Sequence, residues 1–249
     1  MMTLASFSAR PMVRGGLFTL LLAAKLAMIW LLVALISPAH AAAPHKARAV
    51  AKVRSPQIID TAPRVAVILQ TSLGPITVEL DREHAPITAA NFLRYVDQKR
   101  LDGTVFYRSM KLGSEEDGMD QGLIQGGTQN DPKRILKPIA HEPTNITGLK
   151  HLAGAISMAR FAPGTATGDF SILVSPLPGL DADPSRAPAE EPLGYAVFGY
   201  VTDGMDIVRK IHAGATSPTK GTGWLKGQML EPVVKILTVR RAPVQPAAR

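Results

Sequence analysis

Catalysis by a nucleophile or a metal ion needs particular residue types at particular spacings, and this sequence does not show them. None of the 249 residues is cysteine, which excludes a thiol nucleophile, a disulfide framework and cysteine-based zinc sites. Ser157 does not lie in a G-x-S-x-G motif, and His141-Glu142 is not part of H-E-x-x-H. Asp181 and Asp183 are better explained as residues that solvate a loop than as calcium ligands. A hydrolase therefore has little support, and we expect no metal or other cofactor.

Histidines likewise define no site. None of the six histidines is spaced from another as metal ligands usually are. We expect His84, His141, His151 and His212 to be surface residues or loop residues with hydrogen-bond partners.

Three apolar segments instead carry polar residues at which a substrate could bind. These are Phe106-Tyr107-Arg108, Gln125-Gly126-Gly127 and Ser157-Met158-Ala159-Arg160. Taken singly, each has a plain structural explanation. An arginine at the end of an apolar strand can lay its aliphatic stem along the surface, and a glycine pair can form a β-bulge.

Short strands are expected to position these residues. Val65–Thr71 and Ile76–Leu80 alternate around Gly74-Pro75, which is typical of a β-hairpin. Six further short runs are apolar or β-branched: Thr104–Tyr107, Gly122–Ile124, Ala155–Met158, Phe170–Val174, Ala196–Val201 and Val233–Val239. Many short strands of this kind favour a barrel or a sandwich.

Two helices are predicted beside the strands. The first opens with Pro86, and its apolar residues recur at helical spacing: Ile87, Phe92, Tyr95 and Val96. The second spans Asp203–His212 and has Ile207, Val208 and Ile211 on one face. We expect these helices to cap the strands.

The first 41 residues have the pattern of a secretory signal peptide. Residues 1–25 hold three basic residues and no acidic one, and the unbroken apolar run Leu26–Ile36 follows. Ala39-His40-Ala41 then matches a signal peptidase site. The competing interpretation is an uncleaved anchor over Leu17–Ile36, but Lys25 in its middle would be costly in lipid. We therefore expect a periplasmic or secreted protein with no membrane span after cleavage.

The positive charge lies mostly near the N-terminus. The chain has a net charge of +8, of which residues 1–41 contribute +3 and residues 42–63 a further +3, leaving +2 for the remainder. Aromatic content is also low, at 5%. This balance argues against a nucleic-acid partner.

The rest of the chain divides into a linker, one domain and a tail. Residues 42–63 form a basic, Ala/Pro-rich linker, residues 64–241 a single domain, and residues 242–249 a flexible end. Two aperiodic stretches, 111–121 and 182–192, have the composition of loops inserted into the domain.

Taken in order, the motifs resemble the cyclophilin family of peptidyl-prolyl cis/trans isomerases. The resemblance runs from about Val65 to Arg240 and includes the three polar segments above. The other matching pieces are Thr71–Gly74, Glu79-Leu80, Ala85–Phe92, Leu101–Phe106, Leu180-Asp181, Val197–Gly199 and Gly204–Val208. The resemblance implies a closed eight-stranded antiparallel β-barrel capped by two helices. It also implies a monomeric isomerase of X–Pro bonds that acts on proline-containing peptides. Together with the signal-peptide pattern, it indicates exported or envelope proteins as substrates and unfolded secreted chains as partners.

The same resemblance assigns roles to individual residues. Arg108 matches the catalytic arginine of the family motif F-H-R, and Gln125 matches the glutamine that orients it and holds the substrate backbone. Ala159 and Arg160 lie where the family pairs its backbone with the peptide. The remaining residues expected to bind substrate are Phe106, Leu123, Ser171, Leu180 and Tyr195.

The proline pocket departs from the family pattern. Gly122 and Ser171 stand where aromatic residues are usual, and Gly179 stands where a tryptophan often precedes the Leu-Asp pair. Tyr107 replaces the histidine before the arginine, and Tyr195 aligns with another site histidine. The apolar floor for the proline ring is thus thinner, which leaves open a second interpretation: a catalytically weak cyclophilin-like module that binds peptides or proteins.

Overall fold

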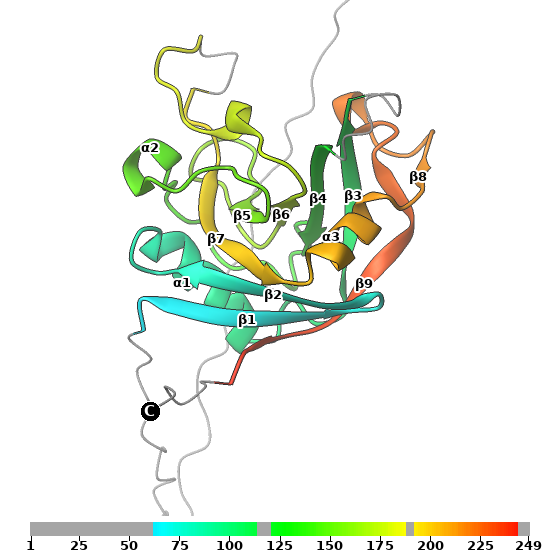
Figure 1. Ribbon diagram of the computed structural model, residues 1–249, viewed down its shortest axis with the longest axis horizontal. Coiled ribbons are helices and arrows are strands. Elements are labelled where there is room, and N and C mark those ends of the chain that lie inside the picture. The colour runs from blue at the N-terminus through cyan, green and yellow to red at the C-terminus, as the bar shows by residue number, and fades with distance from the viewer. Residues whose placement is uncertain (1–61, 114–120, 188–191, 244–249) are drawn as a thin grey trace, which may run out of the picture. The chain divides into compact units, whose positions relative to one another are not determined.

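A closed antiparallel barrel is the main feature of the computed structural model, which describes residues 62–113, 121–187 and 192–243 (Figure 1). Within these residues eight strands form the ring in the order β1-β2-β7-β5-β6-β4-β3-β9, and β9 pairs again with β1 to close it. Their bounds are β1 Arg64–Thr71, β2 Gly74–Asp81, β3 Thr104–Leu112, β4 Gln121–Gly127, β5 Ala155–Met158, β6 Phe170–Leu173, β7 Ala196–Asp203 and β9 Met229–Arg241. The predicted eight-stranded barrel is confirmed.

The first hairpin has its turn two residues earlier than the sequence suggested. Thr71 pairs with Gly74, so Ser72 and Leu73 form the turn and Pro75 lies inside β2. The Thr71 hydroxyl donates to the Gly74 carbonyl oxygen at 2.6 Å and accepts from the Leu73 N–H at 3.1 Å. These bonds satisfy polar groups at the turn, which a glycine-proline pair alone would not do.

Apolar side chains from alternate strand positions fill the barrel. On β1 and β2, Val67, Leu69, Ile76 and Val78 are fully buried, as the period of two requires. A cluster of phenylalanines continues this core towards the first helix: Phe92, Phe106, Phe170 and Phe198. The Phe92 ring lies 5.3 Å from both the Phe170 and the Phe198 rings, centroid to centroid.

Helix α1 spans Pro86–Asp97 and packs one face on this core. Pro86 occupies the first turn, where its missing N–H costs no hydrogen bond. Phe92, Tyr95 and Val96 are buried as predicted, whereas Ile87 is exposed. Ile87 belongs to the helix as predicted, but it lies in the first turn, where the helix meets solvent instead of the core.

A distant carboxylate caps the N-terminus of α1. Glu142 accepts hydrogen bonds from the Ile87 N–H at 3.0 Å and from the Thr88 N–H and hydroxyl, both at 2.6 Å. The Glu142 side chain is buried, and its negative charge faces the positive end of the helix dipole. A residue more than fifty positions away thus performs the capping that Ala85, the local cap residue, cannot.

Replacing this cap is expected to destabilise the domain. Glu142→Ala removes three charge-assisted hydrogen bonds and leaves helix N–H groups unpaired, so the free energy of unfolding should fall by about 1–3 kcal/mol. Urea denaturation followed by circular dichroism measures this change. Glu83→Ala removes an exposed glutamate close to the same helix end and serves as the control, with an expected change within about 0.5 kcal/mol. Equal effects of the two variants would contradict the capping role.

Helix α3 spans Met205–His212, two residues shorter than predicted. Asp203 ends β7, and Gly204 takes a left-handed conformation (φ +86°) at the junction between the strand and the helix. A side chain at this position would place its Cβ 2.4 Å from the Pro75 carbonyl oxygen, so only glycine fits. Val208 and Ile211 are fully buried and Ile207 is partly buried, which confirms the predicted apolar face.

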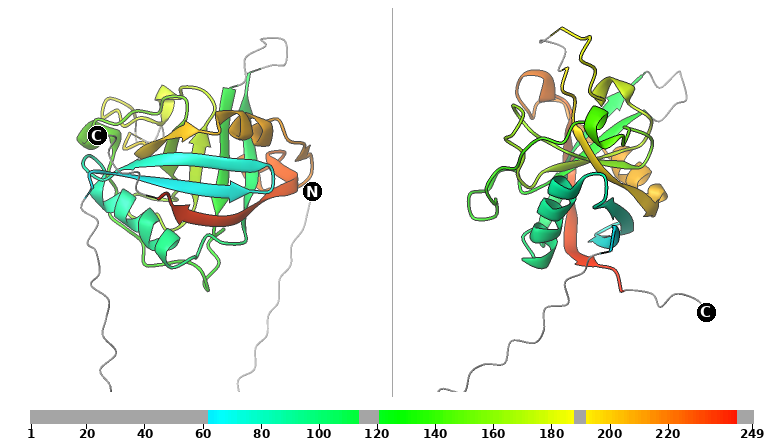
Figure 2. Two further views of the ribbon diagram at one scale, coloured as in Figure 1. Left: turned by 60° about the horizontal axis from the view of Figure 1, so that its bottom comes forward. Right: turned by 90° about the vertical axis from the view of Figure 1, so that its left-hand side faces the viewer.

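The two main helices lie on opposite sides of the β1–β2 hairpin in the left-hand view of Figure 2. Two short elements were not predicted: helix α2 (Thr144–Thr147) and strand β8 (Thr216–Ser217), which pairs with β9. Each spans only about one period of its own pattern, four residues in the helix and two in the strand, so hydrophobic spacing cannot repeat and does not signal them.

Several predicted segments lie outside the described residues. They are the signal peptide at 1–41, residues 42–61 of the linker, 114–120 and 188–191 of the two insertions, and 244–249 of the tail. Among the residues that are described, no helix combines the length and the apolar character needed to cross a bilayer.

Candidate active site

A cleft of about 380 Å³ lies on the outer surface of the barrel, over strands β3 to β6. Its lining includes Tyr107, Arg108 and Met110 from β3 and Leu123 and Gln125 from β4. Further lining residues come from β5, β6 and the connections between elements: Ser157, Met158, Ala159, Arg160, Phe161, Asp169, Ser171, Leu180, Tyr195, Trp224 and Leu225. Residues far apart in the sequence therefore share one apolar surface with a few polar groups.

A bulge in β3 turns Arg108 towards this cleft. Phe106 pairs with Gly126 and Arg108 pairs with Gln125, so Tyr107 is the extra residue. Two residues of β3 then stand opposite one residue of β4, and both of their side chains contact Gln125. Bulges re-aim side chains in this way next to functional sites.

The Arg108 guanidinium is fixed from two directions. Its Nη1 donates to Gln125 Oε1 at 2.6 Å, and its Nε donates to Gln228 Oε1 at 2.8 Å. The Trp224 ring covers one face of the group, with its centroid 4.5 Å from the guanidinium carbon. Burial lowers the pKa of Arg108, but an arginine stays protonated at neutral pH. The cleft therefore holds one positively charged planar donor in a single orientation.

A hydrogen-bonded chain behind Arg108 sets the orientation of Gln125. Gln125 Nε2 donates to the Tyr107 hydroxyl at 2.8 Å, and that hydroxyl donates to Asp169 Oδ2 at 3.4 Å. Burial, reinforced by the nearby Asp169 charge, raises the pKa of Tyr107 well above its usual range, so its proton is retained. Burial also raises the pKa of Asp169. The Gln125 oxygen is consequently left to face Arg108.

Most of the residues predicted for the site meet in the cleft. Arg108 and Gln125 are joined by a hydrogen bond, and the other predicted residues in the lining are Leu123, Ala159, Arg160, Ser171, Leu180 and Tyr195. Phe106 is the exception. Its side chain is fully buried, with its ring 5.8 Å from that of Phe170, so it supports the cleft from inside the barrel. Strand alternation places Phe106 on the inner face, before the bulge turns the next residues outward.

Ala159 and Arg160 both line the cleft, as expected, and each also makes contacts within the protein. The Ala159 N–H already donates to the Asp169 carbonyl oxygen at 3.0 Å, so that group is committed within the protein. The Arg160 guanidinium lies over the Tyr195 ring, 4.7 Å from its centroid, and donates to the carbonyl oxygens of Phe161 and Gly194. A second cation therefore borders the cleft on the side of β5.

The two glycines of the thinned pocket differ in what they allow. At Gly122 the backbone has φ +134°, and a Cβ atom would lie 1.9 Å from the Met110 carbonyl oxygen, so no aromatic side chain fits on this backbone. A Cβ at Gly179 would meet no atom within 4 Å. Met110 and Leu123 supply apolar surface to the cleft near Gly122. An aromatic residue at position 122 would therefore require a different β4 backbone.

His151 is deeply buried and joins two elements under the cleft. Its Nδ1 lies 2.7 Å from Asp181 Oδ1, and its Nε2 lies 2.9 Å from the Ser157 hydroxyl. Burial lowers the pKa of His151 despite the adjacent carboxylate, which favours the neutral ring. Hydrogen bonds join these residues as Ser–His–Asp, which is the arrangement of a nucleophilic triad. The histidine of such a triad must, however, reach the leaving group of the substrate. The His151 side chain has no exposed surface, so we assign the three residues a structural role.

The other histidines follow the expectation in part. His212 is buried and its Nε2 donates to the Met110 carbonyl oxygen at 2.9 Å, although it belongs to α3 and not to a loop. His84 contacts Asp81 at 2.9 Å, and His141 contacts the Leu193 carbonyl oxygen at 3.0 Å, both at the surface.

Three residues on the β8–β9 connection were not predicted from the sequence. Trp224 and Leu225 line the cleft, and Gln228 accepts a hydrogen bond from Arg108. Gln228 is 120 positions from Arg108, and the segment has no periodicity that would connect it with β3. Only the pairing of β3 with β9 brings the two together, with Arg108 opposite Met229. Residue spacing could not have revealed this.

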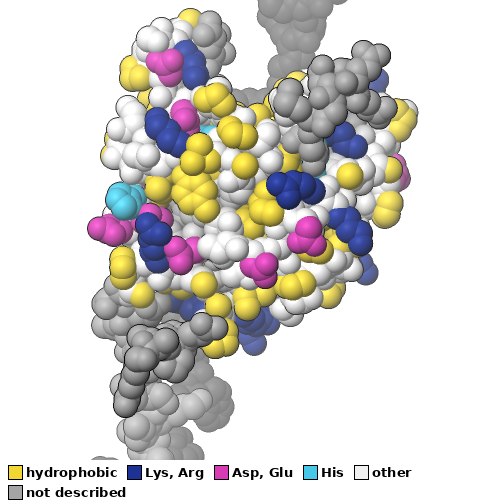
Figure 3. All heavy atoms as spheres, in the orientation of Figure 1, with side chains coloured by type: hydrophobic (Ala, Val, Ile, Leu, Met, Phe, Trp, Pro, Cys, Tyr) yellow, Lys and Arg dark blue, Asp and Glu magenta, His cyan; other side chains and the backbone are white. Residues whose placement is uncertain are grey.

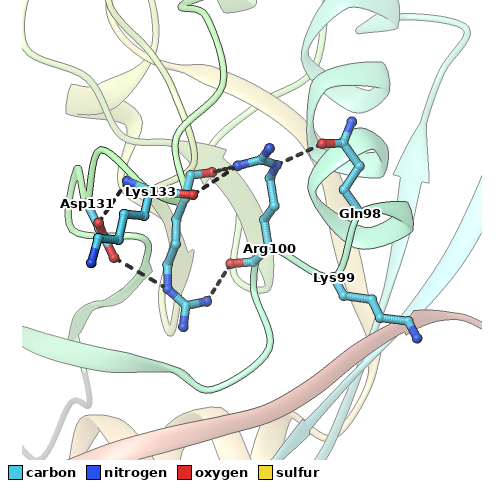
Figure 4. Close-up of a pocket in the computed structure, with 6 residues that line it drawn as sticks. Gln98, Lys99, Arg100, Asp131 and Lys133 are labelled. Atoms are coloured by element: carbon cyan, nitrogen blue, oxygen red, sulfur yellow. Dashed lines mark hydrogen bonds and ion pairs between the residues drawn. The ribbon is translucent and has the colours of Figure 1, made fainter.

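A second hollow, of about 510 Å³, is lined by one neutral polar residue, Gln98, and by five charged residues: Lys99, Arg100, Asp131, Lys133 and Arg134 (Figure 4). Arg100 Nη1 donates to the Lys133 and Arg134 carbonyl oxygens at 3.3 and 2.9 Å. Arg134 Nη1 in turn donates to the Arg100 and Asp102 carbonyl oxygens at 2.9 and 2.8 Å. Both arginines thus tie the segment after α1 to the loop after β4, which is a structural use of their charge. Elsewhere, on the face seen in Figure 3, basic and acidic side chains are interspersed.

Comparisons with known proteins agree with this geometry. The family model described as cyclophilin type peptidyl-prolyl cis-trans isomerase/CLD matches residues 66–241. A peptidyl-prolyl cis-trans isomerase of Acinetobacter baylyi is 38% identical over 178 residues, which cover 70% of this chain and 84% of that protein. One of Streptomyces antibioticus is 39% identical over 158 residues, which cover 62% and 87%.

The fold has solved counterparts as well. A crystal structure of a cyclophilin type peptidyl-prolyl cis-trans isomerase from Cryptosporidium parvum superposes with a TM-score of 0.57 at 21% identity. The superposition covers 74% of this chain and 99% of that one. At this level of identity the likeness concerns the fold alone.

Proposed function

Because the chain belongs to the cyclophilin-type peptidyl-prolyl cis-trans isomerase family, and is thus an isomerase of X–Pro bonds, we propose that Arg108 and Gln125 are its catalytic residues. We also propose that its substrates are exported or envelope proteins. The observation that carries the first part is the Arg108 guanidinium, held between Gln125 and Gln228 at the base of an apolar cleft. The second part rests on the signal-peptide pattern of residues 1–41.

The chemistry follows from the bond that must rotate. Isomerisation of an X–Pro amide has to break amide resonance, against a barrier of about 18–20 kcal/mol. In the twisted amide the proline nitrogen regains a lone pair, which can accept a hydrogen bond that the planar amide cannot. A fixed guanidinium donor therefore binds the transition state better than either isomer, which is the requirement for catalysis. No proton needs to leave the protein, and no covalent bond is made.

Arg108 suits this role because of how it is held. Two of its nitrogens are engaged by Gln125 and Gln228, so the rotamer entropy of a long side chain is lost before the substrate arrives. The rest of the cleft is mostly apolar, with Leu123, Met158 and Leu180 in the lining, and can receive the proline ring.

Exchange NMR on a short X–Pro peptide tests the site assignment. We expect the full-length chain to accelerate exchange between the cis and trans resonances of the peptide. The proposed role of the cleft would be wrong if an Arg108→Ala variant still accelerated exchange, or if the parent did not accelerate it at all.

The proposed destination is tested separately. In the periplasmic fraction of a bacterium that expresses the protein, mass spectrometry should find a chain that begins at Ala42. Only uncut protein in the membrane fraction would support the anchor instead.

The serine at position 171 favours a second candidate, a peptide-binding module with weak catalysis. Ser171 lines the cleft between Gln125 and Ser157, its neighbours across β4 and β5, and leaves space where the family has a phenyl ring. In that case the cleft should bind proline peptides without accelerating their isomerisation.

Refilling this space should strengthen peptide binding. Ser171→Phe restores an aromatic contact of about 1–3 kcal/mol to the proline ring, so the Kd for a proline peptide should fall roughly 5- to 150-fold. Titration calorimetry of the variant beside Ser171→Ala, which removes the hydroxyl without adding a ring, measures the effect. An unchanged or raised Kd for the phenylalanine variant would show that the proline ring binds elsewhere.

A further inference from the structure

Trp224 has both a defined contact and a large exposed surface. It lies in the 3-10 turn Gly223–Leu225 between β8 and β9, and one face of its ring covers the Arg108 guanidinium at 4.5 Å. The residue is nevertheless 70% exposed and lines the cleft beside Leu225. An indole held on a cation in this way offers its free surface to whatever occupies the cleft.

The loop that carries Trp224 is anchored to the same arginine. Gln228 donates from Nε2 to the Trp224 carbonyl oxygen at 2.9 Å, while its Oε1 accepts from Arg108 Nε at 2.8 Å. The Gly227 N–H also donates to the Lys220 carbonyl oxygen at 3.1 Å, which closes the base of the loop. One glutamine side chain thus fixes the position of the indole relative to the guanidinium.

For a substrate bound through Arg108, these distances would place the indole beside the residue next to the proline. A guanidinium nitrogen that donates a hydrogen bond to the proline nitrogen lies about 2.9 Å from that nitrogen. The centre of the Trp224 ring is 4.5 Å from the guanidinium carbon. Neighbouring Cα atoms along a peptide are about 3.8 Å apart, or somewhat less across a cis bond, so the adjacent residue stays within side-chain reach of the ring. An apolar side chain there would cover the exposed face of Trp224.

We propose that Trp224 is a specificity-determining residue that selects X–Pro peptides with an aromatic or large aliphatic side chain next to the proline. The proposal rests on the proposed function of the cleft, and it names the substrate class of that site. The cleft has lost aromatic surface at Ser171, and an indole reaches it from a different loop, against Arg108. Part of the binding energy that the proline ring would supply thus comes from the peptide residue next to the proline.

The test compares peptides that differ in one residue. Full-length protein, Trp224→Ala and Trp224→Phe are each assayed by exchange NMR on two peptide series, with Gly, Ala, Leu or Phe placed before the proline in one and after it in the other. For one of the two positions, the parent should prefer Phe and Leu over Gly by about tenfold or more in kcat/KM. Trp224→Ala should lose about tenfold on those peptides and less than about twofold on the Gly peptide. Trp224→Phe should retain most of the preference, since a ring remains.

Two results would overturn the proposal. An equal loss of kcat/KM with every peptide would mean that Trp224 only positions Arg108, and no loss with any peptide would mean that the indole does not touch the substrate. Leu237→Ala, which removes an exposed apolar side chain of β9 that does not line the cleft, is the control for nonspecific effects.

The inference remains testable even if the proposed catalysis fails. The sequence has two tryptophans, so in a Trp30→Phe background Trp224 is the remaining one. Its fluorescence then reports Kd for the same peptides without turnover. A preference of about tenfold for Phe over Gly in Kd supports the proposal whether or not the parent catalyses exchange. Equal Kd values, together with no catalytic preference in the parent, would exclude it.

Discussion

Replacing Arg108 by alanine should reduce kcat/KM for X–Pro isomerisation by about two to three orders of magnitude, the usual cost of removing one preorganised donor to a developing lone pair. The substrate-binding surface of Leu123, Met158 and Leu180 remains in the variant, so KM should change much less than kcat. Exchange NMR at several peptide concentrations separates the two parameters. This is the largest functional effect that we expect from any single substitution in the domain.

Two further arginine variants make this prediction specific. Arg108→Lys keeps the charge but cannot occupy Gln125 and Gln228 with two nitrogens of one rigid plane, so it should still lose at least about tenfold. Arg94→Ala removes an arginine of α1 that does not line the cleft and should leave kcat unchanged. A parent-like rate in Arg108→Ala, with an unaltered circular dichroism spectrum, would show that the donor lies elsewhere.

The largest effect on stability is expected for Phe92→Ala. Phe92 is 2% exposed, and its ring contacts both Phe170 and Phe198, so its removal leaves a cavity between α1 and the barrel wall. Truncation of a buried phenylalanine costs about 3–5 kcal/mol because apolar contact is lost and the cavity closes only in part. Urea denaturation should show the midpoint moving to lower concentration with an unchanged slope.

An exposed phenylalanine provides the matched comparison. Phe161 is 79% exposed, so Phe161→Ala should change the free energy of unfolding by less than about 0.5 kcal/mol. If Phe92→Ala were as mild as this control, helix α1 would not be packed on the core as described.

The sequence predicted the barrel well because its strands alternate and its helices have one apolar face. Residues such as Val67, Val78 and Ile211 lie where period-two or helical spacing places them. The pairing of Arg108 with Gln125 was also within reach, but only through the order of motifs that resembles the family, since neither residue alone indicates catalysis.

Other features depended on contacts between distant segments. The Glu142 cap of α1, the bulge at Tyr107 and the Gln228 anchor each join elements that no local pattern connects. The burial of His151 beside Asp181 has the same origin, since a histidine in a polar loop carries no sign of what will cover it. Such contacts depend on how the strands and helices are connected in space. The preference of single residues for helix or strand does not predict them.

Closure of the barrel has a consequence for synthesis. The ring is sealed by the pairing of β1 with β9, the first and last strands of the domain, so that Leu69 faces Val239. A nascent chain that has not yet released β9 must therefore leave both β1 and β3 with unpaired edges. Pairing between the two ends of a chain is slow to form. The ribosome thus has to deliver almost the entire chain before this barrel can close. Until then the chain is incompletely folded and can still be threaded through a narrow pore.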